Sequence, residues 1–374
     1  MQNGVPTVCV PNPKTGQCDK PYHNSADVNR GGPHAAASAV KDIDGGKMDG
    51  FIAAVAGAKQ TACISPDAPG CVAGAQAPDV MGYHDQREIP NYWAYAQNFV
   101  LQDKMFEPNA SWSLPSHLFM VSGWSAYCTV PGDPTSCTNA LDGPPSKLNT
   151  TKNDYAWTDL TYLLHKNNVS WAYYLSEGQE PDCENDAMEC QPKALKLRVP
   201  GIWNPLPAFD TVKQDNQLGN IQTLDKYIAA AKAGTLPSVS WIVPENTVSE
   251  HPPARVSLGE SYVTGLINAA MQGPDWNSTA IFLSWDDWGG FYAHVVPPKV
   301  DAYLKFIEDD FLGGQRIDPT TDGRPDPRPT VRESAPQLGD LVSDFDFSQP
   351  PRAPLILPVR GAIPTAQPTA AASD

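Results

Sequence analysis

Two adjacent carboxylates are the residues in this sequence best placed to do chemistry. Asp286 and Asp287 follow a short apolar run at 280–283, which predicts a strand buried on both faces, and precede Gly289 and Gly290, which can break the alternation of a strand. Ligands bind at the carboxyl ends of strands in open α/β sheets, and two carboxylates there repel each other unless a cation or a proton separates them. The pair therefore predicts a site for a hard divalent cation, and flanking aromatic residues favour a partly enclosed position. The alternative is a solvated acidic turn.

A hydroxyl and an imidazole are further candidates for the same site. Ser113 precedes Pro115 by two residues, and His251 lies in a loop after a predicted strand at 238–243. Taken alone, Ser113 is explained as a helix N-cap and His251 as a surface loop residue. Beside a bound cation, however, a serine hydroxyl can become a nucleophile, and a histidine can protonate a leaving oxygen.

Residues 285–298 carry a longer motif, Trp-Asp-Asp-Trp-Gly-Gly-Phe-Tyr-Ala-His-Val-Val-Pro-Pro. It resembles the Asp-Asp/Glu-x-Gly-Gly-Phe-Tyr-Asp-His-Val-x-Pro-Pro signature of the bacterial phosphoesterase family, which includes phospholipases C and acid phosphatases and belongs to the alkaline-phosphatase-like superfamily. The resemblance covers most of the chain. Three other segments are similar to segments of that family: Gly-Gly-Lys-Met-Asp-Gly-Phe at 45–51, the approach to the nucleophile at 79–107, and Ser-Glu-His-Pro-Pro at 249–253.

The resemblance implies a fold, a cofactor and a set of site residues. The fold is an α/β three-layer sandwich with a mainly parallel central sheet, and the activity is metal-dependent hydrolysis of phosphate esters. The substrate is a phospholipid or a small phosphate ester. By their positions in the motifs, Asp286 and Asp287 bind a divalent metal ion of unknown identity, Ser113 attacks phosphorus or ligates the metal, and His251 stabilises the leaving oxygen.

The sequence also departs from the family pattern. Ser116 and His117 stand where the family has Asn-Arg, and Ala293 stands where it has Asp. The family's Glu-Asn-Arg-Ser-Phe-Asp motif, whose Glu and Asn complete the metal site, is missing, as are a strand and a loop that relatives have after Asp301. The resemblance thus implies a truncated chain with two of four protein ligands, weak metal binding and low activity. The competing hypothesis is a catalytically impaired remnant that acts as a non-catalytic extracellular binding protein.

Composition argues against two kinds of partner. The 26 Lys and Arg residues are outnumbered by 42 Asp and Glu residues, which gives a formal net charge of -16 at pH 7. Long-range attraction to polyanions is therefore missing, and nucleic-acid binding is not expected. The longest apolar stretches are much shorter than the roughly 18 residues that a membrane-spanning helix needs, so the sequence predicts no membrane span. No basic-then-apolar signal segment follows Met1.

The eight cysteines fall in close pairs. None has the Cys-x-x-Cys spacing of zinc or redox motifs, so local disulfides are the better interpretation, although eight cysteines allow many connectivities. Disulfides imply an oxidising compartment, and we therefore expect a secreted or periplasmic protein. The four expected bonds are Cys9–Cys18, Cys63–Cys71, Cys128–Cys137 and Cys183–Cys190.

The order of the predicted elements is typical of an α/β fold. Helices are expected from Pro90 and at 157–166, 221–232, 262–271 and 302–312. Strands are expected at 99–101, 169–174, 238–243 and 280–283. This alternation predicts a mainly parallel sheet with helices on both faces.

A change of composition divides the chain near Gly313. We expect residues 1–312 to form a phosphoesterase-like α/β domain with disulfide-tied loops, and residues 313–374 to form a proline-rich C-terminal extension. Asp318, Asp322 and Asp326 recur in this extension at every fourth residue. Because prolines between them preclude a helical face, they predict a solvent-exposed loop.

Overall fold

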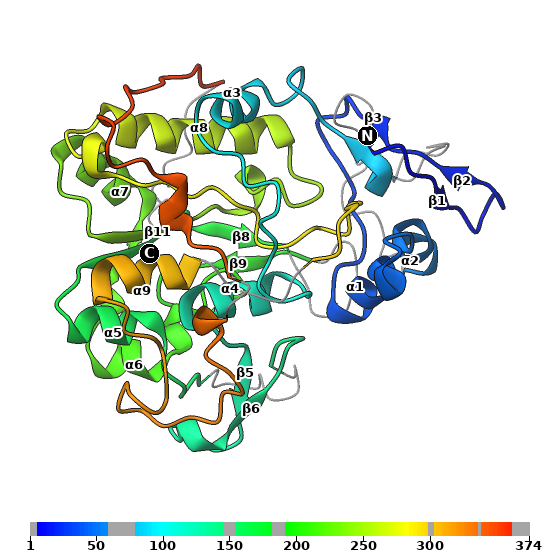
Figure 1. Ribbon diagram of the computed structural model, residues 1–374. Helices are drawn as coiled ribbons and strands as arrows, with labels where there is room; N and C mark the ends of the chain where they lie inside the picture. Colours follow the sequence, from blue (N-terminus) through cyan, green and yellow to red (C-terminus); the bar gives the residue numbers. More distant parts are fainter. Residues whose placement is uncertain are drawn as a thin grey trace, which may run out of the picture.

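A parallel three-stranded sheet lies at the centre of the computed structural model (Figure 1). Its middle strand, β7 (Trp171–Leu175), pairs with β10 (Ile221–Thr223) on one side and with β11 (Val239–Val243) on the other. Every residue of β7 is buried, as expected of a central strand covered on both faces. The predicted α/β class is therefore confirmed. The structure describes residues 6–58, 79–144, 154–181, 191–297, 303–335 and 338–360.

Helices cover both faces of this sheet. Alternate side chains of β7 point to opposite sides, so Tyr173 belongs to one buried cluster and Tyr174 to another. The Tyr173 face packs against four helices: α4 (Ser113–Ser122), α5 (Leu160–Lys166), α6 (Asp210–Gln214) and α9 (Tyr303–Leu312). The Tyr174 face packs against two: α7 (Leu224–Ala233) and α8 (Val256–Gln272).

Local signals explain several helix boundaries. The helix expected at 157–166 begins later, at α5, because the Asp159 carboxylate accepts a hydrogen bond from Thr161 N at 2.8 Å and caps it. The first three residues of the helix expected at 221–232 form β10 instead, and α7 ends before Gly234, whose φ is +68°. Among the described helices, we find none that combines the length and the apolar character needed to cross a bilayer.

Two predicted strands do not form within the ranges given above. Residues 280–283 have no strand structure, and Ile281, Phe282 and Leu283 are between 36% and 39% exposed. An apolar run is buried as a strand only when neighbouring strands pair with it, and the described strands pair elsewhere. The strand predicted at 99–101 is also wrong, because Phe99 instead terminates α3 (Pro90–Asn98).

A lobe of short elements occupies the right-hand side of Figure 1, built around a small apolar core that includes Phe51 and Val80. Trp288 and Tyr292 pack against this core, so the lobe contacts the segment that carries the aspartate pair. Its elements are α1 (Ala36–Ile43), α2 (Phe51–Gly57), β1 (Val10–Pro11), β2 (Cys18–Asp19), β3 (Tyr22–His23) and β4 (Gly82–Tyr83).

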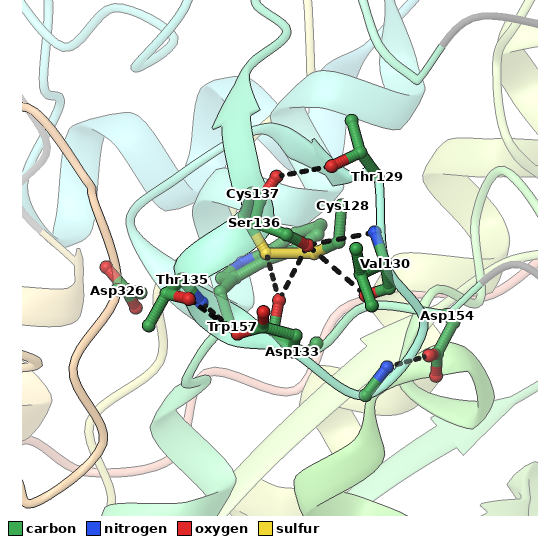
Figure 2. The surroundings of a disulfide bond; sticks show 12 residues. Cys128, Thr129, Val130, Asp133, Thr135, Ser136, Cys137, Asp154, Trp157 and Asp326 are labelled. Carbon is green, nitrogen blue, oxygen red and sulfur yellow. Dashed lines mark hydrogen bonds between the residues drawn. A yellow bond between two sulfur atoms is a disulfide. The ribbon is translucent and has the colours of Figure 1, made fainter.

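Two of the four expected disulfides form in the described chain. Cys9, which precedes β1, is bonded to Cys18 of β2. Figure 2 shows the second bond, Cys128–Cys137, which links β5 (Ala126–Cys128) to β6 (Cys137–Asn139). The pairs Cys63–Cys71 and Cys183–Cys190 lie outside the described residues. One further hairpin joins β8 (Gly178–Glu180) to β9 (Lys193–Leu195).

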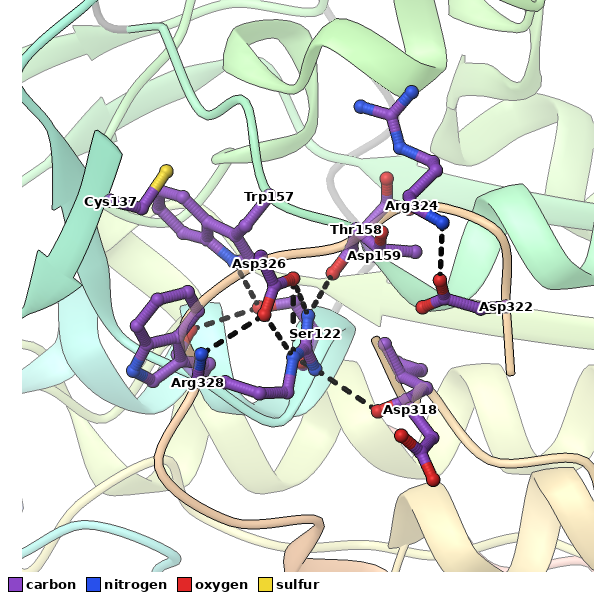
Figure 3. Close-up of polar contacts among 12 residues, drawn as sticks. Ser122, Cys137, Trp157, Thr158, Asp159, Asp318, Asp322, Arg324, Asp326 and Arg328 are labelled. Atoms are coloured by element: carbon purple, nitrogen blue, oxygen red, sulfur yellow. Dashed lines mark hydrogen bonds and ion pairs between the residues drawn. The ribbon is translucent and has the colours of Figure 1, made fainter. Parts of the chain in front are cut away.

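The C-terminal extension packs against the domain, and its aspartates are not all solvent-exposed as predicted. Asp322 is 0% exposed, and the side chain of Asp326 is likewise 0% exposed. Figure 3 shows that Arg328 lies between Asp326 and Ser122 at the end of α4. The prediction failed because the charge that compensates these carboxylates comes from the extension itself. Further along, Leu357 N donates to the side chain of Asn268 on α8 at 3.1 Å.

Candidate active site

The first turn of α4 carries the predicted nucleophile. Ser113 is the first residue of the helix and is 1% exposed, while Trp112 occupies the N-cap position, so an N-cap role does not explain this serine. Its Oγ donates a hydrogen bond to Asp287 Oδ2 at 3.3 Å. The fold thus brings a hydroxyl and a carboxylate together that are 174 residues apart in the chain.

Asp286 lies beside His117, which is in the first turns of the same helix, and is more exposed to solvent than Ser113. Its Oδ2 is 3.6 Å from His117 Nε2, and its side chain is 40% exposed. The imidazole of His117 is buried, and its Nδ1 is 3.4 Å from the hydroxyl of Tyr173, which donates to Trp203 O at 2.7 Å. Asp286 can therefore meet a ligand from solvent while its histidine neighbour is held from within the core.

A double-glycine turn positions the two aspartates. Gly289 and Gly290 both have positive φ, at 56° and 73°, a conformation that favours glycine, although the strand expected before them does not form. Gly289 N donates to Asp287 Oδ1 at 2.6 Å. A Cβ on Gly290 would lie 2.4 Å from Gly32 Cα, and Gly32 N donates to Gly289 O at 2.9 Å, so the turn is fixed by close backbone contact with the N-terminal lobe.

Two tryptophans on either side of the pair anchor its segment. Trp288 Nε1 donates to Asp42 Oδ2 at 3.0 Å. Trp285 Nε1 donates to Glu250 Oε2 at 3.0 Å, and the other oxygen of Glu250 accepts from Tyr92 OH at 2.6 Å. Burial raises the pKa of Glu250 to about 7, although these two hydrogen bonds oppose the shift. The anchor beside the site therefore exchanges a proton near neutral pH.

His251 lies in the loop that follows β11. Its Nδ1 is 2.8 Å from Pro252 O, which fixes the ring with Nδ1 as the donor. The ring is 5.9 Å from that of His34, and the His34 ring is 6.3 Å from that of Trp288, between centroids. His251 is thus joined to the segment of the aspartate pair by a row of aromatic rings.

The sequence analysis missed a third carboxylate near the pair. Glu107 Oε2 accepts a hydrogen bond from Ser116 Oγ at 3.4 Å. Burial raises the pKa of Glu107 well above its usual range, and the charges of Asp287 and Asp286 raise it further. No local pattern could have identified this residue, because it lies in an irregular segment and is brought to the site by the fold.

A second group of possible metal ligands lies elsewhere in the N-terminal lobe. One ligand atom from each of His23, Asp85 and Glu88 lies within 4.8 Å of the others. His23 Nε2 is 2.8 Å from Glu88 Oε2, while Arg87 binds both oxygens of Asp85. Because Arg87 already compensates one of the two carboxylates, this group is a weaker match for a dication.

Most donors around the aspartate pair are oxygens, with one imidazole, His117, whose Nε2 is 3.6 Å from Asp286 Oδ2. The oxygens comprise the carboxylates of Asp286 and Asp287 and the hydroxyl of Ser113. Hard cations such as Mg²⁺, Mn²⁺ and Ca²⁺ prefer this donor set, whereas zinc usually takes histidine or cysteine as well. The residues present therefore fit a hard divalent cation.

Comparisons with known proteins identify sequences that are similar to this chain. A model described as the Phosphoesterase family matches residues 2–317. Phospholipase C A of Mycobacterium tuberculosis is 26% identical over 240 residues, which cover 60% of this chain and 41% of that protein. The hemolytic phospholipase C of Pseudomonas aeruginosa is 28% identical over 250 residues, covering 61% and 32%. The chain thus spans well under half of the length of these curated relatives.

Proposed function

Because this chain belongs to the phosphoesterase family, we propose that it hydrolyses phosphate esters at the site formed by Ser113, Asp286 and Asp287. The observation that carries the proposal is the hydrogen bond from Ser113 Oγ to Asp287 Oδ2 at 3.3 Å. A buried hydroxyl beside a carboxylate, at the first residue of a ten-residue helix, is suited to meet a phosphate group. The phospholipase C names of the relatives support a phospholipid or a related phosphate ester as the substrate.

Each residue has a distinct role in this proposal. Asp286 and Asp287 would hold a divalent cation, which when bound supplies positive charge to the phosphoryl oxygens. Ser113 Oγ loses its proton to Asp287 and forms a bond to phosphorus, while the bond from phosphorus to the leaving oxygen breaks. His251, protonated at Nε2, gives that proton to the leaving oxygen. Water then attacks phosphorus and gives a proton to His251 Nε2, the bond from phosphorus to Ser113 Oγ breaks, and the proton held by Asp287 returns to that oxygen.

The proposal extends to the architecture and the location of the protein. The helices on both faces of the sheet support a three-layer sandwich of the alkaline-phosphatase-like kind. We propose residues 1–312 as the phosphoesterase-like domain and 313–374 as its extension. The two disulfides support a secreted or periplasmic protein, because such bonds persist in oxidising compartments.

Hydrolysis assays with and without metal ions test the proposal. After dialysis against EDTA, the chain is assayed on 4-nitrophenyl phosphate, bis(4-nitrophenyl) phosphate and phosphatidylcholine, each with added Mg²⁺, Mn²⁺, Ca²⁺ or Zn²⁺. We expect slow, metal-dependent hydrolysis of at least one ester. Ser113→Ala and Asp286→Ala should each lower that rate by at least about 100-fold, or roughly 2.7 kcal/mol in the barrier.

Ser111→Ala is the matched control. Ser111 is also buried and also hydrogen-bonds a carboxylate, Asp142 at 3.0 Å, but it precedes the helix and lies outside the proposed site. Its variant should keep the parental rate. If the folded chain hydrolyses none of the esters with any metal, the proposal is wrong and a non-catalytic binding protein is favoured.

A further inference from the structure

Residues 352–360 of the C-terminal extension lie along α8 and have no regular secondary structure of their own. In Figure 1 this segment, drawn in red, runs along α8 toward α3. Two polar side chains of α8 hold its main chain. Asn268 accepts from Leu357 N at 3.1 Å and donates to Leu357 O at 2.8 Å, and Ser261 Oγ bonds Arg360 N at 2.6 Å and Arg360 O at 2.8 Å. Because these bonds go to main-chain atoms, α8 replaces the strand partner that an extended segment otherwise needs.

The same segment reaches the first turn of α3. Asn91, which is 7% exposed, donates from Nδ2 to Pro358 O at 2.9 Å and to Thr264 Oγ1 of α8 at 3.0 Å. The main-chain N–H groups of Asn91 and Tyr92 both donate to Glu260 Oε1, at 2.7 and 3.3 Å, which caps the start of the helix. The start of α3 is thus held by α8 and by the C-terminal segment together.

Tyr92 connects this helix start to the segment that carries the aspartate pair. Its hydroxyl donates to Glu250 Oε1 at 2.6 Å, and its ring packs edge-on against Trp285, with 5.4 Å between centroids. Glu250 also accepts from Trp285 Nε1 at 3.0 Å. Trp285 directly precedes Asp286, so unbroken contacts lead from the C-terminal segment to the first aspartate of the pair.

We propose that residues 352–360 act as a strap that positions the aspartate segment, with Asn91 and Tyr92 as the positioning residues between them. Asn91 contacts the strap and lies in the helix turn that aims Tyr92. Tyr92 in turn supports the hydrogen bond between Glu250 and Trp285. Release of the strap should therefore loosen Trp285 first and slow ester hydrolysis as a result. Only this last step rests on the proposed function.

Two indole N–H groups report on the two ends of this connection. Trp276 Nε1 donates to Arg352 O in the strap at 2.6 Å, and Trp285 Nε1 donates to Glu250. In the full chain labelled with ¹⁵N-tryptophan, NMR separates the indole signals, and Trp276→Phe and Trp285→Phe assign them. The rate at which each indole proton exchanges with water measures how often its hydrogen bond opens.

Asn268→Ala removes two hydrogen bonds to the strap main chain and should free the strap. We expect the indole protons of Trp276 and Trp285 each to exchange with water at least about threefold faster than in the parent. Tyr227→Phe is the matched control, because it removes a hydrogen bond to α8 that comes from α7, from Tyr227 OH to Leu266 O at 3.0 Å. It should leave both exchange rates at their parental values.

A row of contacts transmits a change only if its members are energetically coupled, so a double-variant cycle decides the role of Tyr92. Tyr92→Phe removes the hydrogen bond to Glu250 and should speed exchange at Trp285 by at least about threefold, with no change at Trp276. In that background, Asn268→Ala should add no further increase at Trp285. An additive increase would mean that the strap does not act through Tyr92, and the inference would be wrong.

Three other results overturn the inference and leave the proposed function untouched, because the NMR measurement needs no activity. Faster exchange at Trp276 alone would show a strap that stabilises only α8. Exchange in Asn268→Ala equal to the parent's would show that Asn268 does not hold the strap. Faster exchange at Trp285 in Tyr227→Phe would show a general loosening of α8. If Asn268→Ala does not fold, Ser261→Ala takes its place with the same expectations.

Ester hydrolysis is measured separately on the same variants. If the chain hydrolyses an ester, release of the strap by Asn268→Ala should lower the rate by at least about threefold, because the aspartate segment is displaced. If the chain hydrolyses none, but release of the strap still speeds exchange at Trp285, the proposed function is wrong and the positioning role of the strap stands.

Discussion

The two halves of the candidate site are built in opposite ways. Nine of the ten residues of α4 are buried, so packing of the core fixes the position of Ser113. The segment that delivers Asp286 and Asp287 begins with residues 281–286, all of which are exposed. It is held by a few hydrogen bonds, notably Trp285 to Glu250 and Gly32 to Gly289, and by aromatic contacts of Phe282 and Trp288. We infer that the position of the hydroxyl depends on the stability of the whole domain, whereas that of the carboxylates depends on local anchors.

The largest expected loss of stability comes from replacing Arg328, which contacts the C-terminal end of α4. Arg328 donates to Ser122 O at 3.0 Å and to Thr158 O at 2.9 Å, and it pairs with the fully buried side chain of Asp326. Arg328→Ala leaves that carboxylate buried without its cation, which should lower the free energy of unfolding by about 4 kcal/mol. Urea denaturation measures this loss.

Arg87→Ala is the control for Arg328→Ala, because Arg87 pairs with Asp85 at the surface, where its side chain is 60% exposed. It should leave the unfolding midpoint unchanged, since surface ion pairs contribute little. Equal effects of the two substitutions would mean that the C-terminal extension does not support α4, and the contrast between the two halves would lose one of its main structural causes.

A pair of leucine substitutions compares the two halves directly. Leu118 lies in α4 and is 0% exposed, whereas Leu283 lies in the aspartate segment and is 39% exposed. Leu118→Ala should destabilise the protein by about 3 kcal/mol, because it removes buried methyl groups and leaves a cavity. Leu283→Ala should cost less than about 1 kcal/mol, because half-exposed side chains lose less packing. A similar loss for both, measured by urea denaturation, would show that the segment is packed as firmly as the helix.

The two described disulfides give a third comparison, because they close loops of the same length. Cys128–Cys137 and Cys9–Cys18 each link residues that are nine positions apart, so loop closure alone predicts equal effects. Replacing both Cys128 and Cys137 by alanine should lower the free energy of unfolding by about 2–3 kcal/mol, because the hairpin directly follows α4 and Cys137 is 1% exposed.

Alanine at both Cys9 and Cys18 should have a smaller effect on global unfolding, because Cys18 is exposed at the tip of the N-terminal lobe. Thermal melts of both double variants under identical buffer conditions measure the difference. A larger loss from the Cys9–Cys18 pair would place the N-terminal lobe, rather than the α4 region, at the centre of cooperative unfolding.

Elements with a strong local pattern were predictable from the sequence. The strands near 169–174 and 238–243 and the helices near 262–271 and 302–312 were expected and are present as β7, β11, α8 and α9. The strand at 280–283 was wrong, because burial of an apolar run depends on partners that its own residues do not specify. β10 was missed for the related reason that Ile221 becomes strand only by pairing with Tyr173.

The candidate site shows the same limit. Family motifs marked Ser113 and the aspartate pair, and the fold brings Ser113 Oγ to Asp287, but the roles of these residues stay predictions. Glu107 and Glu250 carry no motif. Each is important only because of what tertiary structure places beside it, namely Asp286 and Asp287 for Glu107, and Trp285 for Glu250. Contacts between residues that are far apart in the chain cannot be predicted from the local sequence.

The smallest expected effect concerns Glu250, the hydrogen-bond acceptor for Trp285, and the way its contribution to stability changes with pH. The pKa of Glu250 is raised from its ordinary value of 4.5 to about 7 in the folded protein, mainly by burial. Between these values the folded state holds a proton that the unfolded state has released, so the contribution of Glu250 to stability falls as pH rises from about 4.5 to 7. Glu250→Gln mimics the protonated form at every pH and should lack this loss.

The test therefore compares the free energy of unfolding as a function of pH in the parent and in Glu250→Gln. Across pH 5 to 8 the parent should lose roughly 2 kcal/mol of unfolding free energy relative to Glu250→Gln, because other carboxyls titrate equally in both proteins and cancel. Asp210→Asn, on α6, is the control: burial and the neighbouring Asp154 raise the pKa of Asp210 to about 6, so the slope of its profile should differ from the parent's below about pH 6 and match it above. If the Glu250→Gln profile runs parallel to the parent's, Glu250 is ionised throughout. The hydrogen bond to Trp285 would then be equally strong at every pH, and the aspartate segment would have a permanent anchor instead of one that depends on a proton.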